Sequence, residues 1–175
     1  MVKFLHAIRD FDKPLIGAVN GVAVGVGTTM LLHCDLVVAA ETSVFSLPFA
    51  KLGVCPEAGS SLLLPALVGH QRAAELMLLG DSFDAQTARS MGLVNRVTPP
   101  SEYCQTAMAL ARRLASLPPT AIRTSKALMK QAQRESLSSV YASELQAFGS
   151  LLKGPEAKES MSAFLEKRAP DFSAF

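Results

Sequence analysis

Hydrophobic positions in the first half of the chain follow two patterns. Short apolar runs bounded by polar or turn residues predict buried strands at 15–19, 36–40, 43–46 and 93–97. Apolar residues at helical spacing predict helices at 2–12, 28–34, 60–68, 71–79 and 84–90. Glycines mark the segment 21–27 as a turn between a strand and a helix. Strands that alternate with helices in this way indicate an α/β core.

The second half of the sequence has no strand pattern. After Pro99-Pro100, helical spacing predicts helices at about 102–116, 120–134, 137–152 and 155–167. We therefore expect an α/β core over residues 1–98 and a helical region over residues 99–175.

Composition excludes several classes of protein. The chain has 175 residues, 49% of them hydrophobic and 18% charged, which is typical of a globular domain with a sizeable core. The formal charge is only +2, the basic residues are spread out and Trp is absent, so a nucleic-acid surface is not expected. The apolar run 15–34 contains several glycines and favours a buried strand-turn-helix unit over a membrane helix.

The cysteines show no pattern typical of a disulfide framework or a zinc site. Their number is odd, they lie far apart, and no CxxC spacing joins any two of Cys34, Cys55 and Cys104. Reduced thiols in an intracellular protein are the expected state.

The glycine-rich segment 21–27 is the first candidate binding element. Closely spaced glycines before a helix allow backbone N–H groups to approach a phosphate or an oxyanion. A dinucleotide GxGxxG motif fails at Met30, and a phosphate-binding P-loop fails because Thr28-Thr29 follows Gly27. The residues leave open the alternative that the glycines only permit tight packing of a helix on a strand.

Glu57 is the candidate proton carrier. It is the only acidic residue between Glu41 and Glu75 and lies in a strongly apolar stretch. Such surroundings disfavour the charged form and raise the proton affinity of a carboxylate into the range of a general base. The alternative is a water-exposed acid at a helix start, stabilised by the helix dipole. A serine nucleophile at Ser60 or Ser61 lacks a GxSxG motif.

Several segments together resemble the crotonase superfamily, which comprises the enoyl-CoA hydratases and isomerases. The resemblance runs over essentially the whole chain and is carried by KPLIGAVNGVAVGVG (13–27), CDLVVAAETSVFSLPFAKLG (34–53), CPEAGSS (55–61), GLVNRV (92–97) and SMSAFLEKR (160–168). The LPF, LG and PEAGSS elements look most like peroxisomal-type Δ3,Δ2-enoyl-CoA isomerases.

The resemblance implies a fold, an assembly and residue roles. The fold would be a spiral of ββα turns, truncated at its amino terminus, followed by helices that assemble a homotrimer or a dimer of trimers. The Val26 N–H matches a donor to the thioester oxygen, and Glu57 matches the isomerase base, which moves a proton from C2 to C4 through a dienolate. Phe148 and Lys167 match positions that contact coenzyme A from an adjacent subunit.

The resemblance also separates the family's activities. Hydratases use two glutamates, and the matching positions here are Thr29 and Phe49, which would instead line the acyl pocket. Isomerisation by one glutamate is therefore expected, with an acyl-CoA thioester as substrate and no metal or separate cofactor. A non-catalytic acyl-CoA-binding or assembly module and another crotonase-type reaction, such as hydration, are the alternatives.

Family members carry roughly another third of chain before the segment that corresponds to residue 1. The resemblance places the second oxyanion donor in that part. The end of the sequence, Ser173-Ala174-Phe175, is not the SKL peroxisomal signal. We expect a cytoplasmic setting, with a mitochondrial one as the alternative.

Overall fold

Two small sheets form the centre of the computed structural model, which describes residues 2–175. The first sheet is parallel, with the order β1-β3-β6, and contains β1 (Ile16–Val19), β3 (Leu36–Ala40) and β6 (Arg96–Thr98). The second has the order β2-β4-β5 and contains β2 (Val22–Val24), β4 (Val44–Ser46) and β5 (Phe83–Asp84). Strands β2 and β4 are parallel, whereas β4 and β5 are antiparallel. The predicted α/β core is confirmed.

Strand β2 corrects the expectation that the whole segment 21–27 is a turn. Its three residues alternate between exposed and buried positions, with Ala23 facing the core. The backbone at Gly21 adopts φ 80°, which only glycine tolerates easily, and its carbonyl accepts a hydrogen bond from the Val44 N–H at 3.0 Å. This strand was not predicted because it is too short to show a clear sequence pattern and is flanked by glycines, which indicate a turn.

The helices of the first half differ from the predicted ones mainly at their ends. They are α1 (Val2–Asp10), α2 (Val26–Thr29), α3 (Ser60–Val68), α4 (His70–Ala74) and α5 (Ala85–Ser90). The helix expected at 28–34 begins two residues earlier and tightens into a 3₁₀ turn, η1 (Met30–His33). A second 3₁₀ turn is η2 (Ala50–Leu52). The helix expected at 71–79 widens into a π-helical turn, η3 (Glu75–Leu79).

Strand β6 also begins later than the predicted strand 93–97. Leu93 and Val94 are buried in the core cluster beside β3 rather than paired in the sheet. The Asn95 side chain accepts a hydrogen bond from the Val37 N–H at 2.7 Å, and pairing with β3 starts at Arg96. Gly92, at φ 83°, sets the turn that directs the two apolar side chains inward.

The main core cluster lies where the two sheets and α5 meet. Phe45 is fully buried and stacks on Phe83 of β5, with ring centroids 5.6 Å apart. Ala85 and Ala88 of α5 are also fully buried in this cluster. Burial of a Phe side chain contributes about 2–3 kcal/mol. The short strands are therefore held by side-chain packing more than by their few ladder hydrogen bonds.

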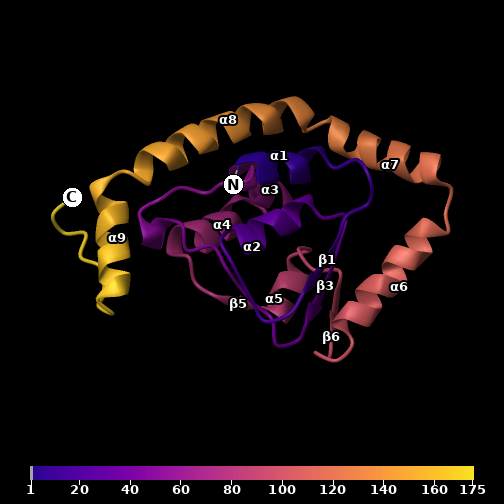
Figure 1. Cartoon of the computed structure of the whole chain (residues 1–175), viewed down its shortest axis with the longest axis horizontal. Coiled ribbons are helices and arrows are strands. Elements are labelled where there is room, and N and C mark those ends of the chain that lie inside the picture. Colours follow the sequence, from indigo (N-terminus) through magenta and orange to yellow (C-terminus); the bar gives the residue numbers. More distant parts are fainter. Residues whose placement is uncertain (1) are drawn as a thin grey trace.

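Four helices follow the sheets. They are α6 (Tyr103–Ala115), α7 (Pro119–Gln131), α8 (Arg134–Leu151) and α9 (Pro155–Leu165). Figure 1 shows α6, α7 and α8 as an arch that curves over the core and brings the chain back past α1 and α3, with α9 turning down at its far end. Helix α6 contacts β1 and β3, α8 contacts α3, and α9 contacts η2. Among residues 2–175, none of the helices combines the length and the apolar character that crossing a bilayer requires.

Gly53 fixes the docking of α9 against η2. It ends η2 in a left-handed conformation, with φ 67°. A Cβ atom at this position would lie 2.6 Å from the Ala157 backbone nitrogen, so the backbones of α9 and the 53 turn approach too closely for any side chain. The Ser160 hydroxyl donates to the Lys51 carbonyl at 3.1 Å across the same contact.

Substitution of Gly53 with Ala is expected to lower the free energy of unfolding by about 2 kcal/mol, because it combines positive-φ strain with a backbone clash. Urea denaturation followed by circular dichroism measures the change. Gly21→Ala is the matched control, since Gly21 also has a positive φ, 80°, but open space around a Cβ atom. An equal loss in both variants would mean that the contact with α9 contributes nothing.

Candidate active site around Glu57

Glu57 is held inward by an unusual turn that precedes α3. The next two residues, Ala58 and Gly59, both have left-handed backbones, with φ 61° and 70°. Ala58 is one of two non-glycine residues with positive φ among those described, and such strain clusters at functional sites. Glu57 is only 5% exposed, so the alternative of a water-exposed acid at a helix start does not hold.

The two oxygens of the Glu57 carboxyl group have different surroundings. Oε1 accepts a hydrogen bond of 2.5 Å from the Thr29 hydroxyl of α2. Oε2 is buried and has no hydrogen-bond partner within residues 2–175. A buried polar atom without a partner is rare in folded proteins and requires a reason. One oxygen is thus anchored and the other is left available.

Burial dominates the electrostatics of this carboxyl group. The pKa of Glu57 is raised above the usual carboxyl value, first because burial disfavours the charged form. The Thr29 hydrogen bond acts in the opposite direction, and the nearby Glu144 carboxylate adds to the rise. A raised pKa makes the ionised group a stronger base than an exposed glutamate.

Glu144 of α8 caps the helix that follows the base. Its Oε2 accepts from the Gly59 N–H at 2.6 Å, while Oε1 accepts from the Ser61 N–H at 2.9 Å and the Ser61 hydroxyl at 2.5 Å. Gly59 is the N-cap residue of α3 and has no side chain to cap it. The carboxylate therefore satisfies free N–H groups and complements the helix dipole from 85 residues further along the chain.

A second set of side chains holds the carbonyl of Ala58. The Nε2 of His33 lies 2.7 Å from the Ala58 oxygen and 3.0 Å from the Tyr141 hydroxyl. The first contact requires a proton on Nε2, and the Tyr141 hydroxyl in turn donates to the Leu5 carbonyl at 3.4 Å. Burial lowers the pKa of His33, so the imidazole is neutral in this network. The turn at 57–59 is therefore fixed from η1, α1 and α8.

The Val26 N–H lies at the start of the same short helix as Thr29. The preceding Gly25 has φ 55° and ψ −117°, a backbone conformation suited to glycine. Within residues 2–175 the Val26 N–H makes no hydrogen bond, whereas the Thr28 and Thr29 N–H groups both donate to the Gly25 carbonyl. Gly25 is therefore needed for the backbone conformation of this turn, and not only to allow a helix to pack closely on a strand.

The remaining predicted residues lie at different distances from this centre. Thr29 is fully buried, and the cavity that it lines beside α3 measures only about 10 Å³. Phe49 is buried in a core cluster, with its ring 3.9 Å from the place a Cβ of Gly25 would occupy. Phe148 is half-buried against the same cluster, and Lys167 is exposed just after α9. The structure thus brings Thr29 to Glu57 but places Lys167 on the surface.

Sequence reasoning did not find the roles of Glu144, His33 and Tyr141. Glu144 is one of several acids in the helical region, and its partner lies 85 residues away. The sequence offered one signal, namely that Gly59 has no side chain to cap the apolar helix that follows it. The free N–H groups at the start of that helix therefore require a hydrogen-bond acceptor from elsewhere in the chain.

A sequence model of the family described as "Enoyl-CoA hydratase/isomerase" matches residues 1–174. The chain belongs to this enoyl-CoA hydratase/isomerase family. It is 44% identical to the enoyl-CoA hydratase/isomerase from Pseudoalteromonas atlantica T6c, with a TM-score of 0.95 over 98% of this chain and 69% of that one. The predicted crotonase fold with a helical carboxyl-terminal region is therefore confirmed.

Members of the enoyl-CoA hydratase/isomerase family with different activities resemble the chain. It is 41% identical over 165 residues to the 2,3-dehydroadipyl-CoA hydratase of Escherichia coli K12, covering 94% of this chain and 65% of that protein. It is 37% identical over 169 residues to the 1,2-epoxyphenylacetyl-CoA isomerase of the same strain, covering 97% of this chain and 64% of that protein. The chain thus spans slightly less than two thirds of the length of these curated relatives.

Proposed function

We propose that this chain provides the catalytic base for the isomerisation of 3-enoyl-CoA to 2-enoyl-CoA, with Glu57 as the only proton carrier. The observation that supports the proposal is the asymmetric Glu57 carboxyl group: Thr29 holds Oε1, and the buried Oε2 has no partner in the described part of the chain. One carboxylate is sufficient for an allylic isomerisation, because the group that removes the proton can return it.

The proposed reaction has two proton transfers. Ionised Glu57 removes a proton from C2, and the electron pair of that C–H bond delocalises over the double bond and the thioester carbonyl to give a dienolate. The protonated carboxyl group then delivers the same proton to C4, so that the double bond moves to C2–C3 and the thioester carbonyl forms again. Glu57 ends ionised, and the overall reaction consumes no water.

Charge develops on the thioester oxygen during the first transfer. The donor that we propose for this oxygen is the Val26 N–H, which makes no hydrogen bond within residues 2–175 and lies on the same short helix as Thr29. Preorganised N–H donors stabilise an oxyanion most where water is excluded. Such a site commonly uses two donors, and loss of one typically reduces the rate by about 10²–10³. We place the second donor in the part of the relatives' length that this chain does not span.

The residues at the hydratase positions favour isomerisation over hydration. Addition of water needs a base that activates the water and an acid that protonates the neighbouring carbon. At the two positions where hydratases carry glutamates, this chain has Thr29, whose hydroxyl is bonded to Glu57, and Phe49, which is buried in a core cluster. Neither side chain ionises at neutral pH, so neither can replace the second glutamate as acid or base.

Coenzyme A binding and assembly form a further part of the proposal. We propose that Phe148 and Lys167 contact coenzyme A bound by an adjacent copy, with the exposed ammonium group of Lys167 beside a phosphate. The homotrimer or dimer of trimers that this arrangement needs would cover apolar side chains of α9, since Phe164 is 79% and Leu165 75% exposed.

Hydration is the second candidate, because relatives such as the 2,3-dehydroadipyl-CoA hydratase of Escherichia coli are hydratases. It would require Glu57 to activate water and another group to supply the proton. The two candidates differ in their products, since hydration yields a 3-hydroxyacyl-CoA and isomerisation does not.

Incubation of the chain with 3-hexenoyl-CoA and with 2-hexenoyl-CoA in deuterium oxide separates these reactions. We expect conversion of the 3-enoyl thioester to the 2-enoyl thioester, detected by chromatography and mass spectrometry. Deuterium is expected at C4 in those turnovers in which the protonated Glu57 carboxyl group exchanges with solvent before it delivers its proton. Faster formation of 3-hydroxyhexanoyl-CoA from the 2-enoyl substrate would establish hydration instead. Binding of both thioesters with no turnover and no exchange at C2 would identify a non-catalytic acyl-CoA-binding module.

A further inference from the structure

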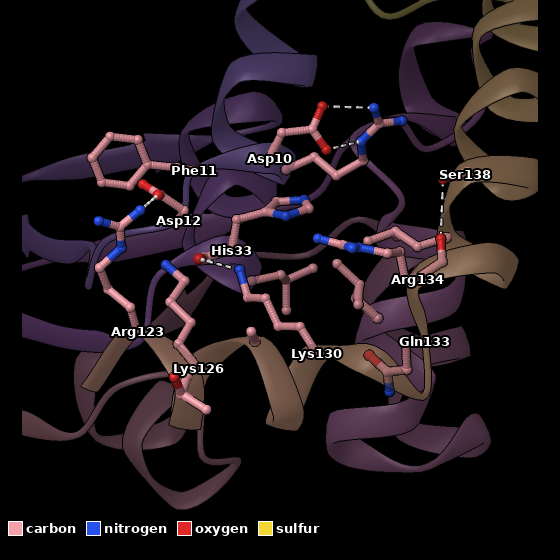
Figure 2. A pocket seen from close by; sticks show the side chains of 16 residues that line it. Asp10, Phe11, Asp12, His33, Arg123, Lys126, Lys130, Gln133, Arg134 and Ser138 are labelled. Atoms are coloured by element: carbon pink, nitrogen blue, oxygen red, sulfur yellow. Dashed lines mark hydrogen bonds and ion pairs between the residues drawn. The ribbon is translucent and has the colours of Figure 1, made fainter. Parts of the chain in front are cut away.

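A cavity of about 380 Å³ lies outside the Glu57 site, on the side of His33 that faces α7. Its walls come from the end of α1, from η1, from α7 and from the start of α8. Figure 2 shows cationic side chains of α7 and α8 entering it from one side, with Asp10, Phe11 and Asp12 opposite. Its volume falls within the range of about 300–1,000 Å³ that is typical of small-molecule sites.

Five cationic residues line this cavity, namely Arg9, Arg123, Lys126, Lys130 and Arg134. Three of them are neutralised by carboxylates. Arg9 pairs with Asp10 at 2.8 Å, Arg123 pairs with Asp12, and Lys126 pairs with Asp35 at 2.6 Å. These pairs occupy the carboxylates of the cavity wall.

Lys130 and Arg134 have no carboxylate within 4.0 Å in the part of the chain that the structure describes. The Lys130 ammonium makes only a long contact, of 3.4 Å, with the His33 carbonyl. Burial and then the Lys126 charge lower the pKa of Lys130, and the more distant Asp35 carboxylate offsets only part of this effect. In Figure 2 the ends of Lys130 and Arg134 both lie beneath the His33 ring, with Lys130 directed toward the His33 carbonyl and Arg134 entering the cavity from the side of α8.

Other groups in the wall do not supply the missing negative charge. Asp10 is held by two hydrogen bonds from Arg9, both at 2.8 Å. His33 is neutral and uses its Nε2 for the Ala58 carbonyl. The two free cationic groups therefore face a space that an external anion can enter.

The rest of the wall defines the body of the ligand. Leu32, Leu63 and Leu137 also line the cavity, so that part of its wall is apolar. A single inorganic phosphate would contact the cations but leave this apolar part uncovered. An anion with a short apolar body would fill both parts.

We propose that this cavity binds a small organic anion, consisting of a phosphate or carboxylate head group on a short apolar chain, through Lys130 and Arg134. Glu57 does not line the cavity, so the inference is independent of the proposed isomerisation. Lys130 and Arg134 would bond the head group, and the leucines would contact the body.

Isothermal titration calorimetry of the whole chain with hexyl phosphate tests the proposal. Inorganic phosphate, which has the head group alone, and hexanol, which has the apolar chain alone, are the comparison ligands. Hexyl phosphate is expected to bind more tightly than either comparison ligand. The double variant Lys130→Gln/Arg134→Gln is expected to lose at least about tenfold in affinity, since a hydrogen bond to a charged group contributes about 1.5–3 kcal/mol. The control Arg112→Gln/Arg113→Gln removes the same net charge from exposed positions of α6 and should bind within about twofold of wild type.

Two outcomes would overturn the proposal. Equal losses in both double variants would show attraction to the overall charge only, and hexyl phosphate binding no tighter than inorganic phosphate would show that no site for an organic anion exists. Circular dichroism confirms that both variants are folded. Competition with coenzyme A distinguishes the source of the anion: displacement that depends on Lys130 and Arg134 identifies the phosphates of coenzyme A, and its absence together with hexyl phosphate binding identifies a separate metabolite.

Discussion

Replacement of Glu57 with glutamine is expected to reduce kcat for 3-enoyl-CoA by about 10³-fold, within the range that general acid-base groups contribute. The amide has the shape of the carboxyl group and can still accept the Thr29 hydrogen bond, but it cannot take up a proton from C2. Steady-state kinetics with 3-hexenoyl-CoA measures the loss, and calorimetry with a saturated acyl-CoA should show an unchanged Kd.

Glu75→Gln is the matched control, because Glu75 is exposed on η3. Turnover by Glu57→Gln at the wild-type rate would remove Glu57 from the mechanism. The variant should also fold. The pKa of Glu57 is raised in the folded state, so the unfolded chain ionises more easily than the folded one. Ionisation of Glu57 therefore lowers stability as the pH rises from the usual carboxyl pKa through the raised pKa. Glutamine removes this penalty, and stability near neutral pH should be equal to or higher than that of wild type.

Replacement of Glu144 with alanine is expected to lower the free energy of unfolding by about 3 kcal/mol. It leaves the buried Gly59 N–H without an acceptor and removes two further hydrogen bonds of Ser61. Urea denaturation measures the loss, and Glu135→Ala, at an exposed position of the same helix, is the control. A loss no larger than that of the control would mean that water replaces the carboxylate at the start of α3.

The variant Glu144→Gln separates two roles of Glu144, the capping of α3 and the electrostatic effect on the pKa of Glu57. Wild-type activity should fall as the pH drops through the raised pKa of Glu57, because the protonated carboxyl group cannot accept a proton. Burial is the main cause of that rise and Glu144 adds to it, so the glutamine variant should move the acid limb of the kcat/KM profile to lower pH. A limb at the wild-type position would restrict Glu144 to a structural role.

The sequence was sufficient to predict most elements but not their exact ends. Long periodic segments such as α6 and α8 were predicted within a few residues, because their pattern extends over several turns. Strands β2 and β5 were missed because they have three and two residues, respectively, and exist only through pairing with β4. The late start of β6 depends on the side chain of Asn95, which no periodicity reveals.

The candidate site could be predicted in part for a related reason. The isolation of Glu57 in an apolar stretch and the glycines before Val26 are local features, visible over a few residues. The groups that hold Glu57 in place are not local: Thr29 precedes it by 28 residues, and Tyr141 reaches His33 from 108 residues away. The second contact depends on the path of the arch formed by α6, α7 and α8 over the core, because Tyr141 lies on α8.

The cap that Glu144 places on α3 has a consequence for the order of events during synthesis. The turn that carries Glu57 is encoded in the first third of the sequence, yet its hydrogen bonds are completed by a residue 85 positions after Gly59. A nascent chain that has not yet released α8 from the ribosome exposes the start of α3 uncapped, with Ala58 and Gly59 free to leave their left-handed conformations. The base is therefore set in its final geometry only after α8 has left the ribosome and Glu144 has reached the start of α3.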